Sequence, residues 1–178
     1  MKTLVTKRLI LRELTLDDLE SFFFYAKKPN IGPKAGWRPH ESIDETLKIL
    51  RMMIHEEEVW CITPKERNIM IGTIGLHVRN FDNALANRKE IGYVLDDTYW
   101  GMGLMTEAVF AVLHYAFIDL ELDEVVCGHM VDNIQSHRVI EKTGFKYTHD
   151  EDRDHFDSTK VKIKMYRITK KEYLGGRK

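Results

Sequence analysis

The feature that most constrains the fold is a run of strand, glycine turn, helix and strand in the middle of the chain. An apolar strand is predicted over 90–95, and a turn with Gly101 and Gly103 leads into a long apolar helix over 104–118. A second apolar strand over 124–131 follows the helix. Two strands joined by a helix in this way form a βαβ unit, in which they lie parallel with a right-handed crossover. The sequence therefore predicts a sheet with parallel strands at its centre.

The remaining segments alternate between the two hydrophobic periods that distinguish helices from strands. Capping-box patterns, in which a hydroxyl residue is followed three positions later by an acidic one, begin two of the helices. Without a repeat, a low-complexity tract or a linker, the chain is predicted to be one domain over 1–178. The expected elements are strands over 4–13, 59–63, 69–78, 145–149 and 161–168, helices over 15–25, 42–57 and 133–143, and loops over 28–41 and 79–89.

Composition excludes several classes of protein. The 178 residues are 43% hydrophobic and 31% charged, and the net charge is −1, which gives no electrostatic basis for binding nucleic acid or an anionic membrane. A basic C-terminal segment over 160–171 is offset by acidic residues over 150–157, and both are expected to be solvated. No apolar run approaches the ~18 residues of a membrane span. Two cysteines, Cys61 and Cys127, lie in apolar runs and are expected to be buried thiols of a cytoplasmic protein.

The glycine turn is a candidate phosphate site. Glycines at a strand-to-helix junction let the backbone approach a ligand closely, and the helix N-terminus adds positive potential. A dinucleotide loop needs a third glycine where this chain has Thr106, and a P-loop needs a lysine and a hydroxyl residue after its last glycine. Both mismatches argue against these nucleotide loops. Taken alone, the turn is also compatible with glycines that serve only the backbone.

A second segment downstream narrows the choice. The residues from Tyr99 to Ala108 (YWGMGLMTEA), together with Asn133-x-x-Ser136 and Gly144-Phe145, resemble the GNAT family of acetyl-CoA-dependent N-acetyltransferases. The tryptophan before the first glycine and the Thr-Glu-Ala after the second resemble its RimJ/RimL branch, which acetylates N-terminal amines of ribosomal proteins. The resemblance extends from Leu9 to about Ile168. It implies the GNAT fold, an α/β (α+β) arrangement in which a mixed, mostly antiparallel sheet carries helices on both faces.

The resemblance also implies where acetyl-CoA would bind, with no metal expected. Backbone N–H groups of the loop would hold the pyrophosphate. The strand over 90–95 is expected to diverge from the strand over 124–131, so that its unpaired backbone groups bind the pantetheine arm like an added strand. The implied cofactor residues are Tyr93, Val94, Leu95, Trp100, Gly101, Met102, Gly103, Leu104, Met105, Thr106, Asn133 and Ser136.

Direct transfer of an acetyl group needs a neutral amine and a proton for the departing thiolate. Many family members protonate the thiolate with a tyrosine at the position of Ile140. Because isoleucine cannot do so, Ser136 is the candidate acid, although a helix cap also explains a serine there. Glu90 is the candidate base, facing the amine through water.

Several other polar residues are weaker candidates. A structural role is expected for Glu107. His77, His129 and His155 are further bases by residue type. His149 and His155 lie among acidic residues, but their spacing matches no standard metal site.

The acceptor side is less well defined. The loop over 28–41, which contains Trp37 and His40, is expected to form its wall or lid. Acidic residues near that side would suit a cationic amine: Glu41, Glu45, Asp82 and Glu90. The expected reaction is acetylation of an N-terminal amine of a ribosomal protein or a similar primary amine. The alternatives are a small-amine or antibiotic acetyltransferase and a coenzyme A-binding sensor without turnover. The expected partners are acetyl-CoA and the amine, with neither nucleic acid nor a membrane, and a homodimer remains open.

Overall fold

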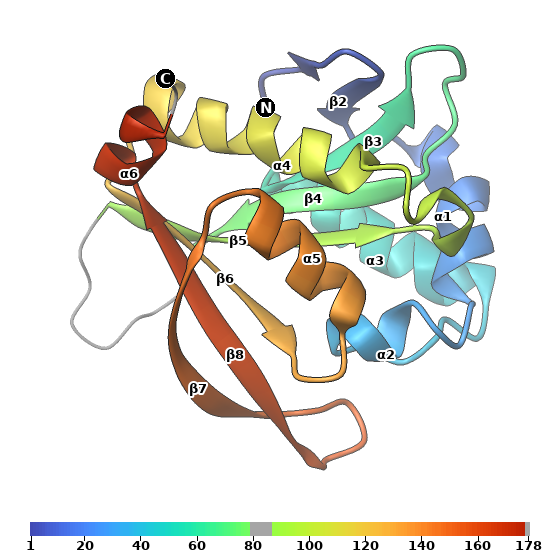
Figure 1. Ribbon diagram of the computed structural model, residues 1–178. Helices are drawn as coiled ribbons and strands as arrows, with labels where there is room; N and C mark the ends of the chain where they lie inside the picture. The colour runs from blue at the N-terminus through green and yellow to red at the C-terminus, as the bar shows by residue number, and fades with distance from the viewer. Residues whose placement is uncertain (79–86, 177–178) are drawn as a thin grey trace.

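The computed structural model describes residues 1–78 and 87–176, which form one eight-stranded sheet with helices on both faces (Figure 1). This arrangement confirms the predicted fold class. The polar loop over 79–89, including Asp82, lies mostly outside the described residues. The elements are β1 Leu4–Val5, β2 Leu9–Glu13, α1 Leu19–Ala26, α2 Gly32–Ala35, α3 Ile43–Glu56, β3 Val59–Pro64, β4 Gly72–His77, β5 Arg88–Leu95, α4 Leu104–His114, β6 Glu124–Met130, α5 Ile134–Lys142, β7 Lys146–Asp154, β8 Lys160–Thr169 and α6 Lys170–Gly175.

The strand order is β1-β2-β3-β4-β5-β6-β8-β7. Every neighbouring pair in the described sheet is antiparallel except β5 and β6, which are parallel and joined through α4. The predicted βαβ unit is therefore confirmed, and it lies in the middle of the sheet. Its parallel ladder is short, running only from Arg88–Glu124 to Glu90–Val126.

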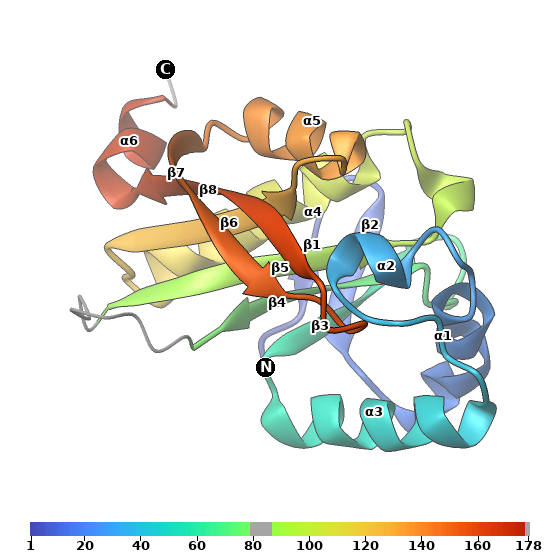
Figure 2. The same ribbon diagram turned by 90° about the horizontal axis from the view of Figure 1, so that it is seen from below.

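Two groups of helices cover opposite faces of this sheet. Helices α4 and α5 lie on one face, and α1 and α3 lie on the other, as the view from below makes clear (Figure 2). On the α4 face the core is built around Leu113 and Phe117, both fully buried. On the opposite face it includes Phe22, Tyr25 and Leu50. The long apolar helix predicted over 104–118 forms α4, which packs its buried residues on the sheet. A π-turn over Tyr115–Asp119 continues it.

The structure differs from the predicted elements in several places. The strand expected over 145–149 is longer and runs as β7 to Asp154. The single strand expected over 4–13 is instead a tight hairpin of β1 and β2, because the Thr6 side chain accepts the Leu9 N–H and turns the chain. A short helix, α2, interrupts the loop expected over 28–41, ending at Gly36 in the left-handed region (φ 91°). A last helix, α6, begins at the capping box Thr169–Glu172, which the sequence reading missed.

The acidic and basic C-terminal runs are cross-strand partners. In the ladder of β7 and β8, Asp150, Asp152 and Asp154 lie opposite Lys164, Lys162 and Lys160 in turn. Opposite charges directly across an antiparallel pair attract one another. β7 is an edge strand with mostly exposed side chains, which agrees with the expected solvated edge.

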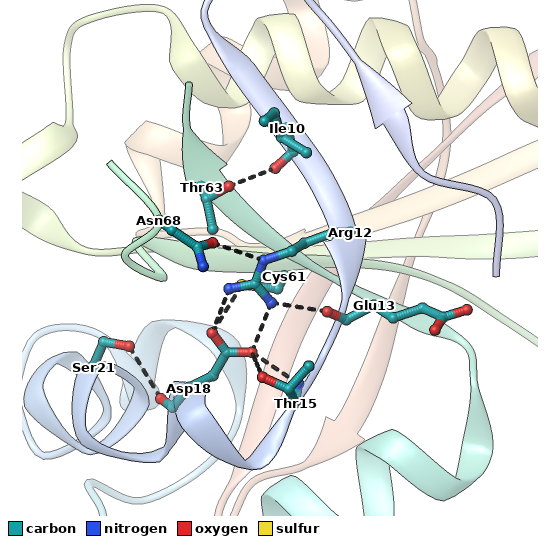
Figure 3. Close-up of polar contacts among 9 residues, drawn as sticks. All are labelled: Ile10, Arg12, Glu13, Thr15, Asp18, Ser21, Cys61, Thr63 and Asn68. Atoms are coloured by element: carbon teal, nitrogen blue, oxygen red, sulfur yellow. Dashed lines mark hydrogen bonds and ion pairs between the residues drawn. The ribbon is translucent and has the colours of Figure 1, made fainter. Parts of the chain in front are cut away.

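A buried ion pair joins β2 to α1 (Figure 3). The Arg12 guanidinium donates to both carboxylate oxygens of Asp18, at 2.7 and 2.9 Å. Asp18 also accepts the Thr15 backbone N–H at 2.8 Å, which confirms the predicted capping box at the start of this helical segment. Burial raises the carboxyl pKa, but the Arg12 and Thr15 hydrogen bonds outweigh it and hold the pKa of Asp18 below its usual value.

The thiols of Cys61 and Cys127 are buried, as predicted. Burial raises the pKa of both thiols, so both remain protonated at neutral pH. Among residues 1–78 and 87–176, no helix is long and apolar enough to cross a membrane.

Candidate active site

The site begins where β5 and β6 separate. After Glu90, β5 continues to Leu95 paired only with β4, since the ladder with β6 has ended. A cavity of about 590 Å³ occupies this opening, and its lining residues come from both faces of the sheet. Val139 of α5 lies at one side, and Met52 and Met53 of α3 lie at the other. The expected divergence of these strands is therefore present, with a space between the two helix layers.

Nearly all of the expected cofactor residues line this cavity. The exception is Met102, whose side chain is exposed. The lining members of the set are Tyr93, Val94, Leu95, Trp100, Gly101, Gly103, Leu104, Met105, Thr106, Asn133 and Ser136.

The glycine loop presents the N-terminus of α4 to the cavity. Gly101 and Gly103 both have left-handed backbones (φ 78° and 72°), which other residues adopt only with strain. Gly103 is the residue that precedes the helix, so the unpaired N–H groups of its first turn follow directly at 104–106. The Trp100 indole N–H donates to the Leu95 carbonyl at 2.8 Å and ties the loop to the end of β5.

Glu107 anchors this loop to the N-terminal hairpin, as its expected structural role requires. Its carboxylate accepts from the Thr6 hydroxyl at 2.6 Å and from the Arg8 backbone N–H and side-chain Nε at 2.7 Å each. Arg8 also donates to the Met102 carbonyl at 2.9 Å. Burial alone would raise the Glu107 pKa, but these hydrogen bonds lower it below the usual value. Met105 is buried in the core beneath the loop.

The acidic turn before the glycine loop is bound by residues of the segment over 28–41. The Lys28 ammonium lies 2.6 Å from carboxylate oxygens of both Asp96 and Asp97. Asn30 donates to Asp97 at 2.7 Å, and this bond together with Lys28 lowers the pKa of Asp97 to about 2. A charged cluster thus joins the segment over 28–41 to the turn that leads into the glycine loop.

Across the opening, the first turn of α5 contributes two polar residues. The Asn133 carboxamide oxygen accepts the Ser136 backbone N–H at 3.1 Å, so Asn133 is the helix cap. Its amide nitrogen donates to the Lys34 carbonyl at 3.0 Å, which commits the side chain to holding α5 and α2. Ser136 is not the cap, and its hydroxyl oxygen lies 3.0 Å from the Tyr93 hydroxyl oxygen. Ile140, where many family members have a tyrosine, is buried in the core.

The sequence predicted a role for the backbone of Tyr93 but not the contact of its hydroxyl with Ser136. The signal was strand alternation: Ile91, Tyr93 and Leu95 share one face of β5, and that face packs on α4 and α5. Burial raises the pKa of Tyr93, so its hydroxyl stays protonated. Two cations of α5, Arg138 and Lys142, also line the cavity and were missed. Their spacing of four residues places them on the same helix face.

At the other end of the cavity, Glu90 lies at the last pair of the parallel ladder. Its side chain is 16% exposed and accepts from the Arg153 guanidinium at 3.1 Å. His77 lies directly opposite Glu90 in the register of β4 and β5, and both line the cavity. Of the other acidic residues expected near the acceptor, Glu41 and Glu45 pair with Arg38 and do not line the cavity.

The segment over 28–41 forms a wall of the cavity, as expected, through residues such as Ile31 and Trp37. His40 is not part of that wall. Its imidazole is buried, lies 2.8 Å from the Thr46 hydroxyl, and has a pKa lowered chiefly by burial. One carboxylate that was not expected, Glu56 of α3, lines the same end.

Comparison with known proteins agrees with this geometry. Residues 8–146 match the family model described as the acetyltransferase (GNAT) domain. The chain belongs to the GNAT family of acetyltransferases, which use acetyl-CoA as the acetyl donor, and it is an N-acetyltransferase by this relationship.

Three relatives illustrate the relationship. The uncharacterized N-acetyltransferase YoaA of Bacillus subtilis is 31% identical over 80% of this chain and 82% of its own. The ribosomal-protein-serine acetyltransferase of Escherichia coli is 36% identical over 40% of each chain. The crystal structure of a GNAT-family acetyltransferase from Bacillus anthracis superposes with a TM-score of 0.86, covering 96% of this chain and 99% of that one at 21% identity.

Proposed function

We propose that this protein transfers the acetyl group of acetyl-CoA to a primary amine of a protein N-terminus, by direct attack of the amine on the thioester. The observation that supports the proposal is the opening between β5 and β6. It has a helix N-terminus and two cations at one end and an acidic pocket at the other. Phosphates favour the first environment and an ammonium ion favours the second.

On the donor side, the loop over 100–106 would hold the pyrophosphate, with Arg138 and Lys142 supplying positive charge. The free edge of β5 over 93–95 would hydrogen-bond the pantetheine amides as an added strand. A backbone N–H near Val94, on the free edge of β5, would stabilise the oxyanion formed when the amine attacks. The residues present therefore fit the donor.

Ser136 is the proposed proton donor to the departing thiolate. Its hydroxyl is free of the helix cap and is paired with Tyr93, a second neutral hydroxyl. The Tyr93–Ser136 pair provides a chain of two O–H groups in place of the tyrosine that Ile140 cannot supply. Neither cysteine is in the lining of the cavity, which is consistent with direct transfer rather than an acetylated enzyme.

Glu90, the candidate base from the sequence, is proposed here as the contact for the incoming amine rather than as the base, because Arg153 engages its carboxylate. Its carboxylate attracts the ammonium form and orders water beside it, while Arg153 fixes its orientation. A ribosomal-protein N-terminus as acceptor, the RimJ/RimL-like assignment, rests on the partial match to the Escherichia coli enzyme. Small amines are the competing acceptor class, since the acidic end of the cavity would attract any alkyl ammonium.

Two measurements test the proposal. Acetyl-CoA at about one hundred times its Kd should stabilise the fold by about 2.7 kcal/mol, whereas NAD and ATP should not. Thiol release should then be recorded with serine-starting peptides, spermidine and kanamycin as acceptors. Stabilisation by NAD alone would refute the donor assignment. Tight acetyl-CoA binding with no thiol release from any acceptor would identify a sensor instead, and turnover only with spermidine or kanamycin would identify a small-amine enzyme.

A further inference from the structure

An imidazole and a carboxylate form a fixed pair at the acceptor end of the cavity. His77 Nδ1 lies 3.1 Å from Glu58 Oε2, and the other oxygen of Glu58 accepts the Val78 backbone N–H at 3.4 Å. A carboxylate beside one ring nitrogen favours the tautomer with the proton on that nitrogen. The neutral ring therefore carries its proton on Nδ1 and leaves the lone pair on Nε2.

Nε2 is directed over bare backbone. Gly75 and Gly92 are direct partners in the ladder of β4 and β5, on the same face as His77. A Cβ built on Gly75 would lie 2.7 Å from His77 Nε2, and one built on Gly92 would lie 3.6 Å from it. The two glycines and His77 all line the cavity. The imidazole thus lies over a side-chain-free floor, and both belong to the lining of the cavity.

The other two candidate histidines are committed elsewhere. His129 is bound at both ring nitrogens, by the Met130 carbonyl and the Tyr166 hydroxyl, and burial lowers its pKa. His155 contacts Asp157 and the Pro33 carbonyl through its two nitrogens. Within residues 1–78 and 87–176, His77 Nε2 has no hydrogen-bond partner. Of the three, only His77 combines a lone pair facing the cavity with a carboxylate behind the ring.

The charges around His77 are mainly negative. Glu58 contacts the ring from the segment before β3, Glu90 faces it from β5, and Glu56 lines the same end from α3. Among the described residues, the cation beside this group is Arg153 of β7, which forms ion pairs with Glu90 and Glu151. Such surroundings attract an ammonium ion toward the ring.

We propose that His77 is the general base that takes the proton of the acceptor amine, and that Glu58 is the residue that positions it. The inference rests on the proposed function. The alkyl ammonium gives one proton to Nε2 directly or through water, and His77 later releases it to solvent. The nitrogen lone pair then forms the C–N bond, the C–S bond breaks, and the second nitrogen proton ends on the coenzyme A sulfur through Ser136.

The decisive experiment is a pH–rate profile of thiol release for His77→Gln, using the most active amine among the serine-starting peptide, spermidine and kanamycin. At pH 7 kcat should fall about 100-fold with the acetyl-CoA KM unchanged. The deficit should shrink as the pH rises past the pKa of the amine used, about 8 for a peptide N-terminus and ~10 for an alkyl amine, because the amine then supplies its own neutral form. His55→Gln, which removes an exposed imidazole from α3, should keep the wild-type profile. A deficit independent of pH, or no deficit, would overturn the proposal.

Glu58→Gln tests the positioning role, because it keeps the side-chain shape but removes the charge. We expect a kcat loss of about 10-fold with the acetyl-CoA KM unchanged, because the ring loses the carboxylate that orients it. Rescue by Glu58→Asp would support a carboxylate requirement. A Glu58→Gln enzyme with wild-type kcat would remove Glu58 from the pair.

A measurement that needs no acceptor separates failure of this inference from failure of the proposed function. Nitrogen-15 NMR of the wild-type protein, with His77 assigned through His77→Gln, should show the neutral ring protonated on Nδ1. An Nε2-protonated ring would refute His77 as the base even if the enzyme is active. Absent acetyl-CoA stabilisation and absent thiol release in the wild type would instead refute the proposed function.

Discussion

At the residue scale, the two hydroxyl groups of Ser136 and Tyr93 lie together in the lining of the cavity. Ser136 comes from α5 and Tyr93 from β5, and their oxygens are 3.0 Å apart. Asn133 satisfies the helix N-terminus, so the Ser136 hydroxyl is available for other contacts. Burial keeps Tyr93 neutral and able to donate a proton.

Replacing Ser136 by alanine should separate catalysis from binding. We expect kcat to fall on the order of 10- to 100-fold, with acetyl-CoA affinity changed less than threefold, because the hydroxyl acts on the leaving thiolate. Steady-state thiol release and calorimetric titration measure the two quantities. Ser21→Ala, which removes a hydroxyl from α1, serves as the control. An equal loss of affinity and rate would indicate a binding role for Ser136.

The Arg12–Asp18 ion pair should make stability depend on pH. Asp18 is 3% exposed, so Arg12→Met leaves a buried charge without its partner and should cost about 3 kcal/mol at pH 7. The folded pKa of Asp18 is below its unfolded value of about 3.9, so this contribution is present above that pH and lost on further acidification. Urea unfolding of both proteins should therefore show a difference that narrows toward pH 3.

The double variant Arg12→Met with Asp18→Asn is the matched control, since it removes both charges. It should recover part of the stability lost at pH 7. A single variant as stable as the wild type at pH 7 would contradict the assigned role of the pair.

At the scale of elements, the N-terminus of α4 is the centre of the proposed donor site. The loop reaches it through two left-handed glycines, and the Trp100 indole and Glu107 fix its ends. The contacts to phosphate would come from backbone N–H groups rather than from side chains. Loop conformation is therefore expected to matter more than loop side chains.

Gly103→Val should weaken acetyl-CoA binding by tenfold or more. A β-branched residue at φ 72° is strained by about 1–2 kcal/mol, which the loop relieves by changing conformation. Calorimetry measures the affinity, and circular dichroism checks that the fold persists. Met102→Ala, in the same loop but with an exposed side chain, should bind normally. Unaltered affinity in Gly103→Val would argue against phosphate binding at this loop.

At the scale of the whole molecule, the divergence of β5 from β6 opens a cavity that reaches both helix layers. The cavity at this opening is lined by residues of α5 on one face of the sheet and of α3 on the other, and these helices lie on opposite faces in Figure 2. The sheet is closed on either side of this opening by antiparallel ladders. Under the proposed function, donor and acceptor would approach one reaction point from opposite faces.

Hydrogen exchange should detect the donor in this opening. Acetyl-CoA should slow exchange of amides over 91–95 that are not paired with β4, because the pantetheine arm would occupy the free edge. Amides of the β2–β3 ladder should be unchanged and provide the internal control. Protection elsewhere with none over 91–95 would place the donor outside the opening.

Much of the fold was predictable from local patterns. Hydrophobic period and helix caps identified the βαβ unit and the helices that start near Ser42 and Asn133. The hairpin at Thr6 was missed because a side-chain hydrogen bond, rather than hydrophobic period, turns the chain there. Of the candidate site, the glycine loop and Ser136 were identified, whereas His77 was indistinguishable from the other histidines by residue type.

The sequence by itself determined the order of the main strands and helices, the glycine loop and the family, because these depend on residues within a few positions of one another. Tertiary structure alone decided which side chains meet: Tyr93 with Ser136, 43 residues apart, and Glu90 with Arg153, 63 residues apart. It also selected His77 by placing its ring between Glu58 and the Gly75–Gly92 floor. Strand register and the end of the β5–β6 ladder set these contacts, and neither is written in any short stretch of sequence.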